Sequence, residues 1–186
     1  MHGDLEQKDR DQNLIRFTNR SATIMVATDV AARGLDIDKL DVVVNYELSK
    51  ETEVHVHRAG RTGRAGESGQ VWTLFDNSDK HRLEQLSKAL NKKIKDYSLP
   101  STHVLKSQPP KPATVTLEIN AGKKQKLRPG DILGALTGDA GIEGAAVGKI
   151  KIFTTRSFVA VDRNVVKKAQ AGLHKIKGRS FRVRSI

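Results

Sequence analysis

The sequence lacks cysteine, long apolar runs and paired metal ligands, and each absence excludes a class of protein. Without cysteine among its 186 residues, the chain forms no disulfide and no cysteine-ligated metal site. No apolar run approaches the roughly 20 residues that span a membrane, and the mostly polar residues 1–20 are not typical of a signal peptide. The histidines lack metal-ligand spacing, with His55 and His57 only two residues apart. We expect a cytoplasmic protein with no membrane partner and no metal site of its own.

Acidic residues are scarce in the second half of the chain. Residues 1–98 hold 16 Lys and Arg and 16 Asp and Glu, whereas residues 99–186 hold 17 and 5. The whole net charge of +12 therefore lies after residue 98. A domain with this imbalance repels itself unless a polyanion binds it, which favours nucleic acid as the partner. An anionic membrane surface is the alternative, but no basic amphipathic helix of the required type is evident.

Proline is also scarce, and its distribution divides the chain. Four of the five prolines lie between residues 97 and 113. Pro109, Pro110 and Pro112 favour an extended, semi-rigid backbone. We therefore predict a linker over residues 99–112 between two domains, 1–98 and 113–186.

The first domain alternates helix and strand signals. Apolar spacing predicts helices over residues 7–17 and 52–58, and a third from an Asp76 N-cap to about residue 91. Strands are predicted at 23–27, 42–46 and 70–75. Strands separated by helices indicate an α/β fold with a parallel sheet, in which ligands lie beyond the carboxyl ends of the strands.

The second domain has a different order of elements. Strands are predicted at 114–119, 146–153, 157–161 and 181–185. One helix is expected to start at Pro129, in a first-turn position that suits proline, and another to be capped by Asp162. This βαββαβ order is that of an RNA-recognition motif, an α+β fold.

Residues 57–64 read His-Arg-Ala-Gly-Arg-Thr-Gly-Arg and carry the most informative pattern. Arg58, Arg61 and Arg64 repel one another at a spacing of three, and the intervening glycines weaken a helix. A bound polyanion favours such a run, because guanidinium groups suit phosphate oxygens and glycine permits close approach of the backbone. A solvated basic loop is the alternative. The preceding run at 22–38, Ala-Thr-Ile-Met-Val-Ala-Thr-Asp-Val-Ala-Ala-Arg-Gly-Leu-Asp-Ile-Asp, argues against that alternative.

Together, and in this order, the two runs resemble motifs V and VI of the DEAD-box RNA helicases. The block at 122–139, with Gly148-Lys149-Ile150, closely resembles the C-terminal domain of the DbpA subfamily, so that the resemblance covers essentially all 186 residues. It implies a second RecA-like domain that is truncated at its N-terminus, followed by an RNA-recognition-motif-like domain. No Gly-x-x-x-x-Gly-Lys-Thr loop and no Asp-Glu-Ala-Asp sequence occurs in the chain. We therefore expect the back portion of a longer protein, with Met1 in place of an interior residue.

The resemblance assigns roles in ATP binding and hydrolysis. Arg61 and Arg64 are expected to contact the γ-phosphate of ATP that is bound, with Mg²⁺, mainly on the missing first RecA-like domain. His57 is expected to link that phosphate to the RNA side, and a capping or core histidine is the alternative. Asp36 matches the position that accepts a hydrogen bond from the ATP ribose. Arg58 is open between this site and an intradomain ion pair.

The resemblance also places RNA-backbone contacts in the first domain. Thr28 and Gly34 match motif V positions near the RNA backbone, where a hydroxyl and a close main-chain approach suit phosphate contact. Gln7 and Arg10 match a Gln-x-x-Arg element, with Arg10 as the phosphate contact. A simple surface pair on a helix is the alternative for these two.

The second domain departs from the standard RNA-recognition motif. Thr116 and Arg156 stand where base-stacking aromatics are usual, and stacking contributes about 1–3 kcal/mol per base. We therefore expect binding of structured RNA through phosphates, with a generally solvated lysine surface as the alternative. The predicted contacts are basic side chains in loops and strands: Lys123, Lys124, Lys126, Arg128, Lys149, Lys151 and Arg156.

The sequence thus predicts the C-terminal part of an ATP-dependent RNA helicase of the DbpA type. The subfamily resemblance implies a large-subunit ribosomal RNA hairpin as partner and a role in assembly of that subunit. The chain itself is not expected to hydrolyse ATP, because it lacks the phosphate-binding loop. A motor-independent RNA-binding adaptor module is the alternative function.

Overall fold

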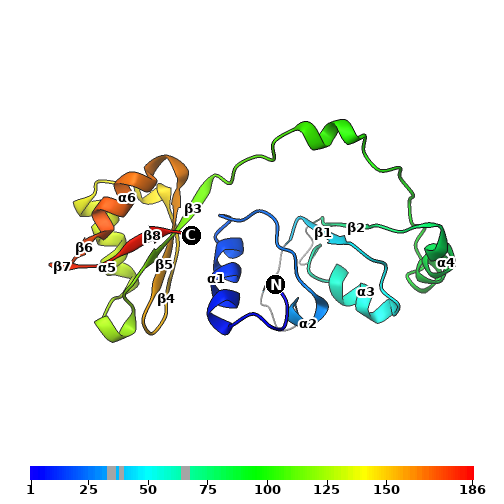
Figure 1. Cartoon of the computed structure of the whole chain (residues 1–186), viewed down its shortest axis with the longest axis horizontal. Helices are drawn as coiled ribbons and strands as arrows, with labels where there is room; N and C mark the ends of the chain where they lie inside the picture. The colour runs from blue at the N-terminus through cyan, green and yellow to red at the C-terminus, as the bar shows by residue number, and fades with distance from the viewer. Residues whose placement is uncertain (33–36, 38–39, 64–67) are drawn as a thin grey trace. The chain divides into compact units, whose positions relative to one another are not determined.

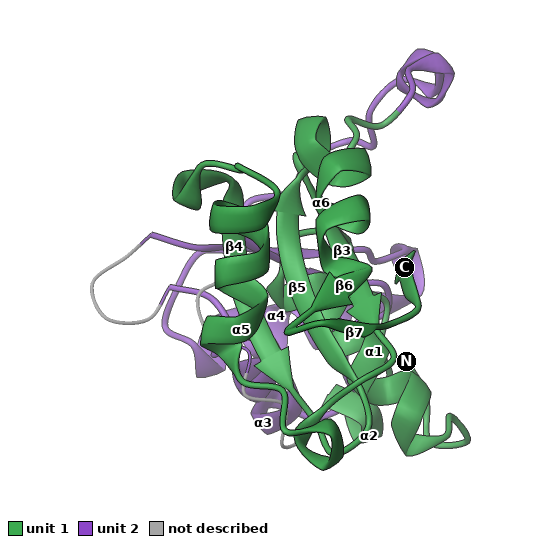
Figure 2. Cartoon of the chain, turned by 90° about the vertical axis from the view of Figure 1, so that its left-hand side faces the viewer, with its two compact units in different colours: residues 1–34, 109–186 green, residues 35–108 purple. Residues whose placement is uncertain are grey.

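The chain folds into two compact units. The computed structural model describes residues 1–32, 37, 40–63 and 68–186. Contacts group residues 1–34 with 109–186 in one unit and residues 35–108 in the other (Figure 2). The domain boundaries at 98/99 and 112/113 therefore stay a prediction. None of the helices in these described ranges has both the length and the apolar character needed to cross a bilayer.

The unit of residues 35–108 is built on a small parallel sheet (Figure 1). Strands β1 (Val42–Asn45) and β2 (Gln70–Thr73) pair in parallel, with Val42 opposite Gln70. Helix α3 (Thr52–Ala59) connects them, and a 3-10 turn (Asn77–Asp79) leads into helix α4 (Lys80–Ala89). These elements confirm the predicted α/β pattern, including the Asp76 cap, whose side chain accepts from the Ser78 amide at 2.7 Å.

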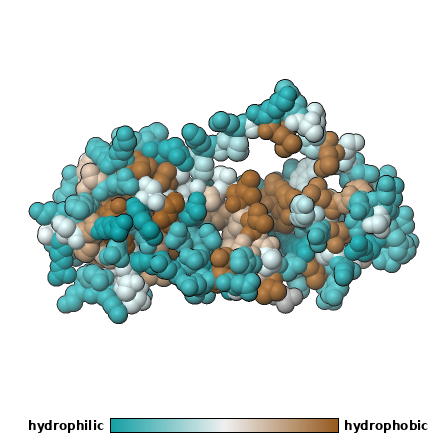
Figure 3. Space-filling view, in the orientation of Figure 1, coloured by the Kyte–Doolittle hydropathy of each residue, from teal (hydrophilic) through white to brown (hydrophobic). Residues whose placement is uncertain are grey.

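Apolar side chains of this sheet remain exposed. Val44 and Trp72 are 63% and 47% exposed, and apolar residues appear on the surface over β1 and β2 in Figure 3. Strands of parallel sheets are ordinarily covered on both faces. Among the described residues of this unit, the buried apolar side chains are Ile37, Leu48 and Leu86.

The strand predicted at 23–27 does not form. Its residues lie outside the described helices and strands, and Ile24 and Val26 are 78% and 80% exposed. The segment hydrogen-bonds instead to the first residue: the Met1 amino group donates to the Val26 carbonyl, and the Thr28 amide donates to the Met1 carbonyl at 3.0 Å. An apolar run becomes a strand only where a neighbouring strand offers its backbone, and here none of the described strands does. Helix α1 (Gln7–Thr18), by contrast, forms as predicted, and a short α2 (Asp29–Ala32) follows.

The C-terminal part of the other unit has the predicted βαββαβ order. Its sheet runs in the order β4-β5-β3-β8 and is antiparallel throughout. The strands are β3 (Thr114–Ile119), β4 (Val147–Ile152), β5 (Ser157–Asp162) and β8 (Val183–Ser185). Figure 2 shows α5 (Pro129–Gly134) and α6 (Val166–Leu173) covering one face of this sheet.

A dense apolar core lies between that sheet and its helices. Alternate residues of β3 and β5 point into it, among them Leu117, Ile119, Val159 and Val161, all fully buried. Ile132 and Leu173 meet them from α5 and α6. On the opposite face the end of α1 contacts β3: Asn19 Nδ2 donates to Thr116 Oγ1 at 3.2 Å, and Thr114 Oγ1 donates to the Asn19 carbonyl at 2.7 Å.

Strand β4 contains a bulge at Gly148 and Lys149. Val147 pairs with Val161 and Ile150 with Val159, so two residues of β4 stand opposite Ala160. A Cβ at Gly148 would lie 3.0 Å from the Ala160 Cβ, which suits glycine there. The extra residue resets the alternation of the strand. Val147, Ile150 and Ile152 consequently all pack against the core.

Four details differ from the sequence predictions. Asp162 is the last residue of β5 and makes no side-chain cap, because a 3-10 turn (Arg163–Val165) begins the helical segment. A π-helix (Ala135–Asp139) extends α5. The linker segment contains a 3-10 turn (Thr102–Lys106), capped by Ser101. A short hairpin of β6 (Lys175–Ile176) and β7 (Arg179–Ser180), not predicted, precedes β8.

Candidate nucleic-acid and nucleotide interface

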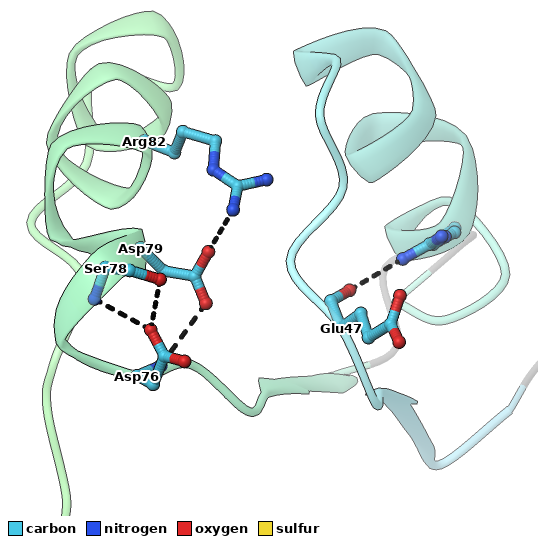
Figure 4. A network of polar contacts seen from close by, with 6 residues as sticks. Glu47, Asp76, Ser78, Asp79 and Arg82 are labelled. Atoms are coloured by element: carbon cyan, nitrogen blue, oxygen red, sulfur yellow. Dashed lines mark hydrogen bonds and ion pairs between the residues drawn. The ribbon is translucent and has the colours of Figure 1, made fainter.

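Arg58 anchors the start of the arginine run. It lies near the end of α3, and its Nη1 donates to the Glu47 carbonyl at 3.1 Å and to Asn45 Oδ1 at 3.4 Å. In Figure 4 a dashed line marks the hydrogen bond that ends on the Glu47 carbonyl oxygen. Asn45 itself is buried and donates to Thr73 Oγ1 at 3.0 Å. Arg58 thus ties α3 to the end of β1 within its own unit, through a backbone carbonyl and an amide oxygen; the predicted intradomain ion pair stays a prediction.

The backbone after α3 is held in a fixed course. The Leu40 amide donates to the Arg61 carbonyl at 3.1 Å, and the Thr62 hydroxyl donates to the Leu40 carbonyl. Gly63 has a φ of 66°, a left-handed conformation that favours glycine. At Gly69 an added Cβ would lie 2.0 Å from Thr62 Oγ1. Close packing of Thr62 therefore holds the backbone from which the Arg61 side chain projects. Arg61 itself is half-buried.

The two histidines of α3 differ in environment. His57 is exposed, whereas His55 is buried. Burial lowers the pKa of His55 below its ordinary value, and the nearby Arg58 guanidinium lowers it further. His55 Nδ1 has no hydrogen-bond partner among the described residues. His57 is thus the histidine of this helix that reaches solvent, and its catalytic role stays a prediction.

Three predicted residues, Gly34, Asp36 and Arg64, lie outside the described residues. The contacts of Asp36 with ribose and of Arg64 with phosphate therefore stay predictions. Within the described ranges, no group of three or more His, Asp or Glu side chains gathers as a metal site. These described side chains do not fit a Mg²⁺ ion.

The predicted RNA contacts at the N-terminus lie in two settings. Arg10 is half-buried on α1, beside a Gln7 whose Nε2 donates to Asp11 Oδ1 at 2.7 Å. Thr28 is exposed, and its carbonyl and hydroxyl accept from the Ala32 and Ala31 amides at 2.9 and 3.4 Å. Thr28 thus begins α2 as well as facing solvent. Both RNA roles stay predictions.

The outer sheet face of the C-terminal domain is occupied by charges instead of open aromatic rings. Glu118 is only 6% exposed and pairs with Arg184 Nη2 at 2.6 Å and with Arg156 Nη1 at 3.6 Å. Phe158 lies opposite Glu118 in the register and is fully buried, with the Arg156 guanidinium 5.7 Å from its ring centre. This face offers little ring surface for stacking, as the sequence predicted. Arg156, with its side chain 17% exposed, also serves this internal network.

The predicted basic loop is built into a docked turn. The Lys123 and Lys124 amides donate to the carbonyls of Phe153 and Thr154, each at 2.9 Å. A Cβ at Gly122 would lie 2.2 Å from the Phe153 carbonyl oxygen, so only glycine permits this approach. The turn therefore rests on the β4–β5 connection through its backbone. Its basic side chains are left exposed to solvent: Lys123, Lys124, Lys126 and Arg128.

The β4–β5 hairpin adds further cations beside this turn. Lys149 and Lys151 are exposed on β4. Lys151 Nζ lies 5.6 Å from the centre of the Phe153 ring, within reach of a cation–π contact. Phe153 in turn packs edge-on against Phe158, with ring centres 5.6 Å apart. The structure thus brings the lysines of two separate sequence segments to one corner of the domain.

Residues 1–66 match the family described as helicase conserved C-terminal domain, and residues 116–185 match the DbpA RNA binding domain. The chain is 49% identical to the ATP-dependent RNA helicase DbpA of Escherichia coli, over 99% of this chain and 40% of that protein. It is 42% identical to the ATP-dependent rRNA helicase RRP3 of Coccidioides immitis, over 56% of this chain and 22% of that protein. A DEAD box protein from Methanococcus jannaschii, of known structure, is 37% identical, with a TM-score of 0.48 over 53% of this chain and 27% of that one. The chain thus spans less than half the length of each of these relatives.

Proposed function

Because the chain belongs to the DEAD-box RNA helicases and carries a DbpA RNA-binding domain, we propose that it supplies two parts of an ATP-dependent RNA helicase. The first part completes a nucleotide site that an N-terminal RecA-like domain begins. The second part binds the helicase to its RNA. The observation that carries the proposal is that both family matches occur in one chain.

The nucleotide role rests on the arginines after α3. The backbone at Arg61 is held by hydrogen bonds of Leu40 with Arg61 and with Thr62. Arg58 is hydrogen-bonded to the Glu47 carbonyl after β1. Arg61 and Arg64 would contact the γ-phosphate when the two RecA-like domains close on ATP and RNA. An arginine supplied across such a cleft accelerates phosphoryl transfer by about 10³–10⁵-fold. Asp36 would accept a hydrogen bond from the ATP ribose. Mg²⁺ would be bound together with the triphosphate, mainly by the N-terminal RecA-like domain.

The RNA role rests on the basic corner of the C-terminal domain. Its lysines project from a turn whose backbone is docked through Gly122, so the chain loses little conformational entropy on binding. The outer sheet face carries an internal ion-pair network and little exposed ring surface. Contacts with phosphates, and therefore with the shape of a folded RNA, are favoured over reading of single-stranded bases.

The finer substrate follows the relatives. One relative is by name an rRNA helicase and another an RNA helicase DbpA, which favours ribosomal RNA as the ligand. From the resemblance to the DbpA subfamily we propose, more specifically, a hairpin of large-subunit ribosomal RNA as the ligand and assembly of that subunit as the process. Binding of the hairpin would hold the motor near adjacent duplex. Such a tether raises the effective concentration of the motor at its target without a new contact.

The RNA role is tested by removing charge from the docked turn. In the full chain, Lys123→Ala, Lys124→Ala and Lys126→Ala together should weaken binding to a ribosomal RNA hairpin and lower the slope of log affinity against log salt by about 0.7–0.9 for each lost phosphate contact. The matched control, Lys88→Ala with Lys92→Ala and Lys93→Ala, removes the same charge near the end of α4. An unchanged slope in the first variant would place the RNA site elsewhere.

The nucleotide role is tested by supplying the other domain. The chain alone should show background ATP hydrolysis with any RNA, and addition of an N-terminal RecA-like domain from the E. coli relative should restore RNA-stimulated turnover. Arg61→Ala should abolish the restored turnover and leave RNA binding intact. Robust hydrolysis by the chain alone would contradict the proposal. Hairpin binding without any restored turnover would favour the motor-independent adaptor.

A further inference from the structure

A second basic segment closes the C-terminal domain. The last 13 residues contain Lys175, Lys177, Arg179, Arg182 and Arg184 and no acidic residue. Arg184 is paired with Glu118, but the side chains of Lys175 and Arg179 are exposed and have no ion pair within the described part of the chain. These two residues lie on the β6–β7 hairpin, to which the proposed function assigns no role.

The hairpin is closed by a tight turn and anchored in the core by one residue. Ile176 pairs with Arg179 across a two-residue turn of Lys177 and Gly178, whose φ angles are 51° and 75°. Two successive positive φ values define the tight type I′ turn that matches the twist of paired strands. Ile176 is 2% exposed and anchors the hairpin in the core. Alternation along the strand then directs Lys175 to the outer face of the hairpin. Arg179, opposite Ile176, lies on the face toward the core and is nevertheless exposed, so the two cations emerge on opposite sides of the hairpin.

Lysine at the turn is a costly choice. A left-handed conformation costs a residue with a Cβ about 1–2 kcal/mol, and asparagine, aspartate or glycine is usual in this turn. Lys126, at the end of the docked basic turn, also has a positive φ, of 57°. Both basic turns thus hold a lysine in a conformation that local stability does not favour.

One carboxylate joins the two turns. Asp131 Oδ1 lies 2.7 Å from Lys177 Nζ, and Asp131 Oδ2 accepts from the Arg128 amide at 2.9 Å. The carboxylate is only 13% exposed. Since the turn of residues 122–128 is itself docked on the β4–β5 connection, these contacts connect three basic segments of the domain. Figure 1 shows β6 and β7 beside α5, where Asp131 lies.

We propose that the β6–β7 hairpin is a second phosphate-binding element for the same RNA, with Lys175 and Arg179 as its contacts and Asp131 as the positioning residue that aligns it with the turn of residues 122–128. The inference rests on the proposed RNA-binding function and extends it to a separate part of the chain. A guanidinium and an ammonium group on this hairpin suit backbone phosphates of a folded RNA, which present no base edge to read.

The contact residues are tested in the full chain with a fluorescent ribosomal RNA hairpin and anisotropy titrations at several salt concentrations. Lys175→Ala with Arg179→Ala should weaken binding at least tenfold and lower the salt slope by about 1.4–1.8, the value for two lost contacts. Lys88→Ala with Lys92→Ala removes the same charge and should change neither quantity. If the hairpin variant binds within twofold of the unmodified chain, the inference is wrong. If the unmodified chain itself does not bind the RNA, the proposed function fails instead.

The positioning role of Asp131 has a test with a distinctive sign. Asp131→Asn removes a negative charge, which by simple electrostatics strengthens binding of a polyanion. We expect the opposite, a several-fold loss with a lower salt slope, because Lys177 is released and the two turns lose their alignment. Asp139→Asn removes the same charge from an exposed site eight residues away and should leave binding unchanged or slightly tighter.

Two outcomes would overturn the positioning role. Tighter binding by Asp131→Asn, equal to that of Asp139→Asn, would show that only net charge matters. A loss that Asp131→Glu fails to restore, with an unchanged salt slope, would show a folding defect without a defect in phosphate contact. Circular dichroism of each variant, recorded beside the titrations, identifies any that fails to fold.

Discussion

The C-terminal domain and the unit of residues 35–108 differ in how far they bury apolar side chains of their strands. Ile119 of β3 and Val159 and Val161 of β5 are fully buried in the core beneath α5 and α6, whereas Val42 and Val44 of β1 and Val71 of β2 are 37–63% exposed. The C-terminal domain therefore has an extensive apolar core of its own. The unit that carries the arginine run holds its geometry through a few polar ties, namely those of Arg58, Thr62 and Asn45. Apolar burial dominates the stability of the C-terminal domain. In the unit of residues 35–108, hydrogen bonds dominate the local order.

The largest expected effect tests that contrast in apolar packing. Leu117→Ala removes a fully buried side chain and should destabilise the C-terminal domain by about 2–5 kcal/mol. Val44→Ala changes a side chain that is 63% exposed and should cost less than about 0.5 kcal/mol. Urea unfolding followed by circular dichroism measures the first. Emission of Trp72, the single tryptophan, follows the second, because it lies in β2. Equal costs would remove the contrast between the two regions.

A second prediction compares two glycines that permit close packing. Gly122→Ala sets a methyl group against the Phe153 carbonyl, and Gly69→Ala sets one against Thr62 and the Gly63 amide. Each should cost about 1–3 kcal/mol through forced backbone shifts. The first should also weaken RNA binding, and the second should reduce only the restored ATPase. Gly130→Ala is the control, because an added Cβ there would meet no atom within 4 Å. Loss of both activities from either variant would show that the two sites are not independent.

A third and smaller effect separates the regions by pH. The pKa of His55 is lowered by burial and by Arg58, so the unfolded form takes up a proton near pH 6.5 and the folded form takes it up only at lower pH. Stability of residues 35–108 should therefore fall as the pH drops below about 6.5, by at most about 1.4 kcal/mol per pH unit for one proton. The hydrogen bond from Lys177 keeps the pKa of Asp131 low, so its contribution persists until the pH falls below about 4.

Trp72 emission and circular dichroism, recorded from pH 7.5 to 5, measure this difference. The unfolding transition followed by Trp72 emission should move to lower denaturant concentration as the pH drops. The unfolding transition of the C-terminal domain should not move. His55→Gln should remove the shift. A shift that persists in His55→Gln would assign the effect to another group.

The elements that the sequence predicted well are those whose pattern is local. The alternation of Val115, Leu117 and Ile119 predicted β3 at its observed bounds, because a half-buried strand needs only a period of two. The apolar run Ile24-Met25-Val26 failed as a strand prediction, because a strand also requires a neighbour, and sequence periodicity carries no information about neighbours.

The candidate site divides in the same way. The lysines of residues 123–128 were predicted as exposed cations, and the structure exposes them. The β6–β7 hairpin was missed because its strands are two residues long, too short for a periodic signal; the Lys177-Gly178 pair was the available sign of a turn. The double role of Asp131 depends on Lys177, 46 residues later, and only folding brings the two together.

The bulge in β4 has a consequence for how this strand tolerates changes in length. The extra residue at Gly148 and Lys149 allows Val147 and Ile150, three positions apart, to face the core together. Deleting one of the two bulge residues would leave both on the core face, because a single residue between them restores regular alternation. Inserting a residue after Ile150, where the pairing is regular, would instead turn Lys151 inward and Ile152 outward. The start of β4 is therefore expected to accept a one-residue deletion, whereas an insertion near its end is not.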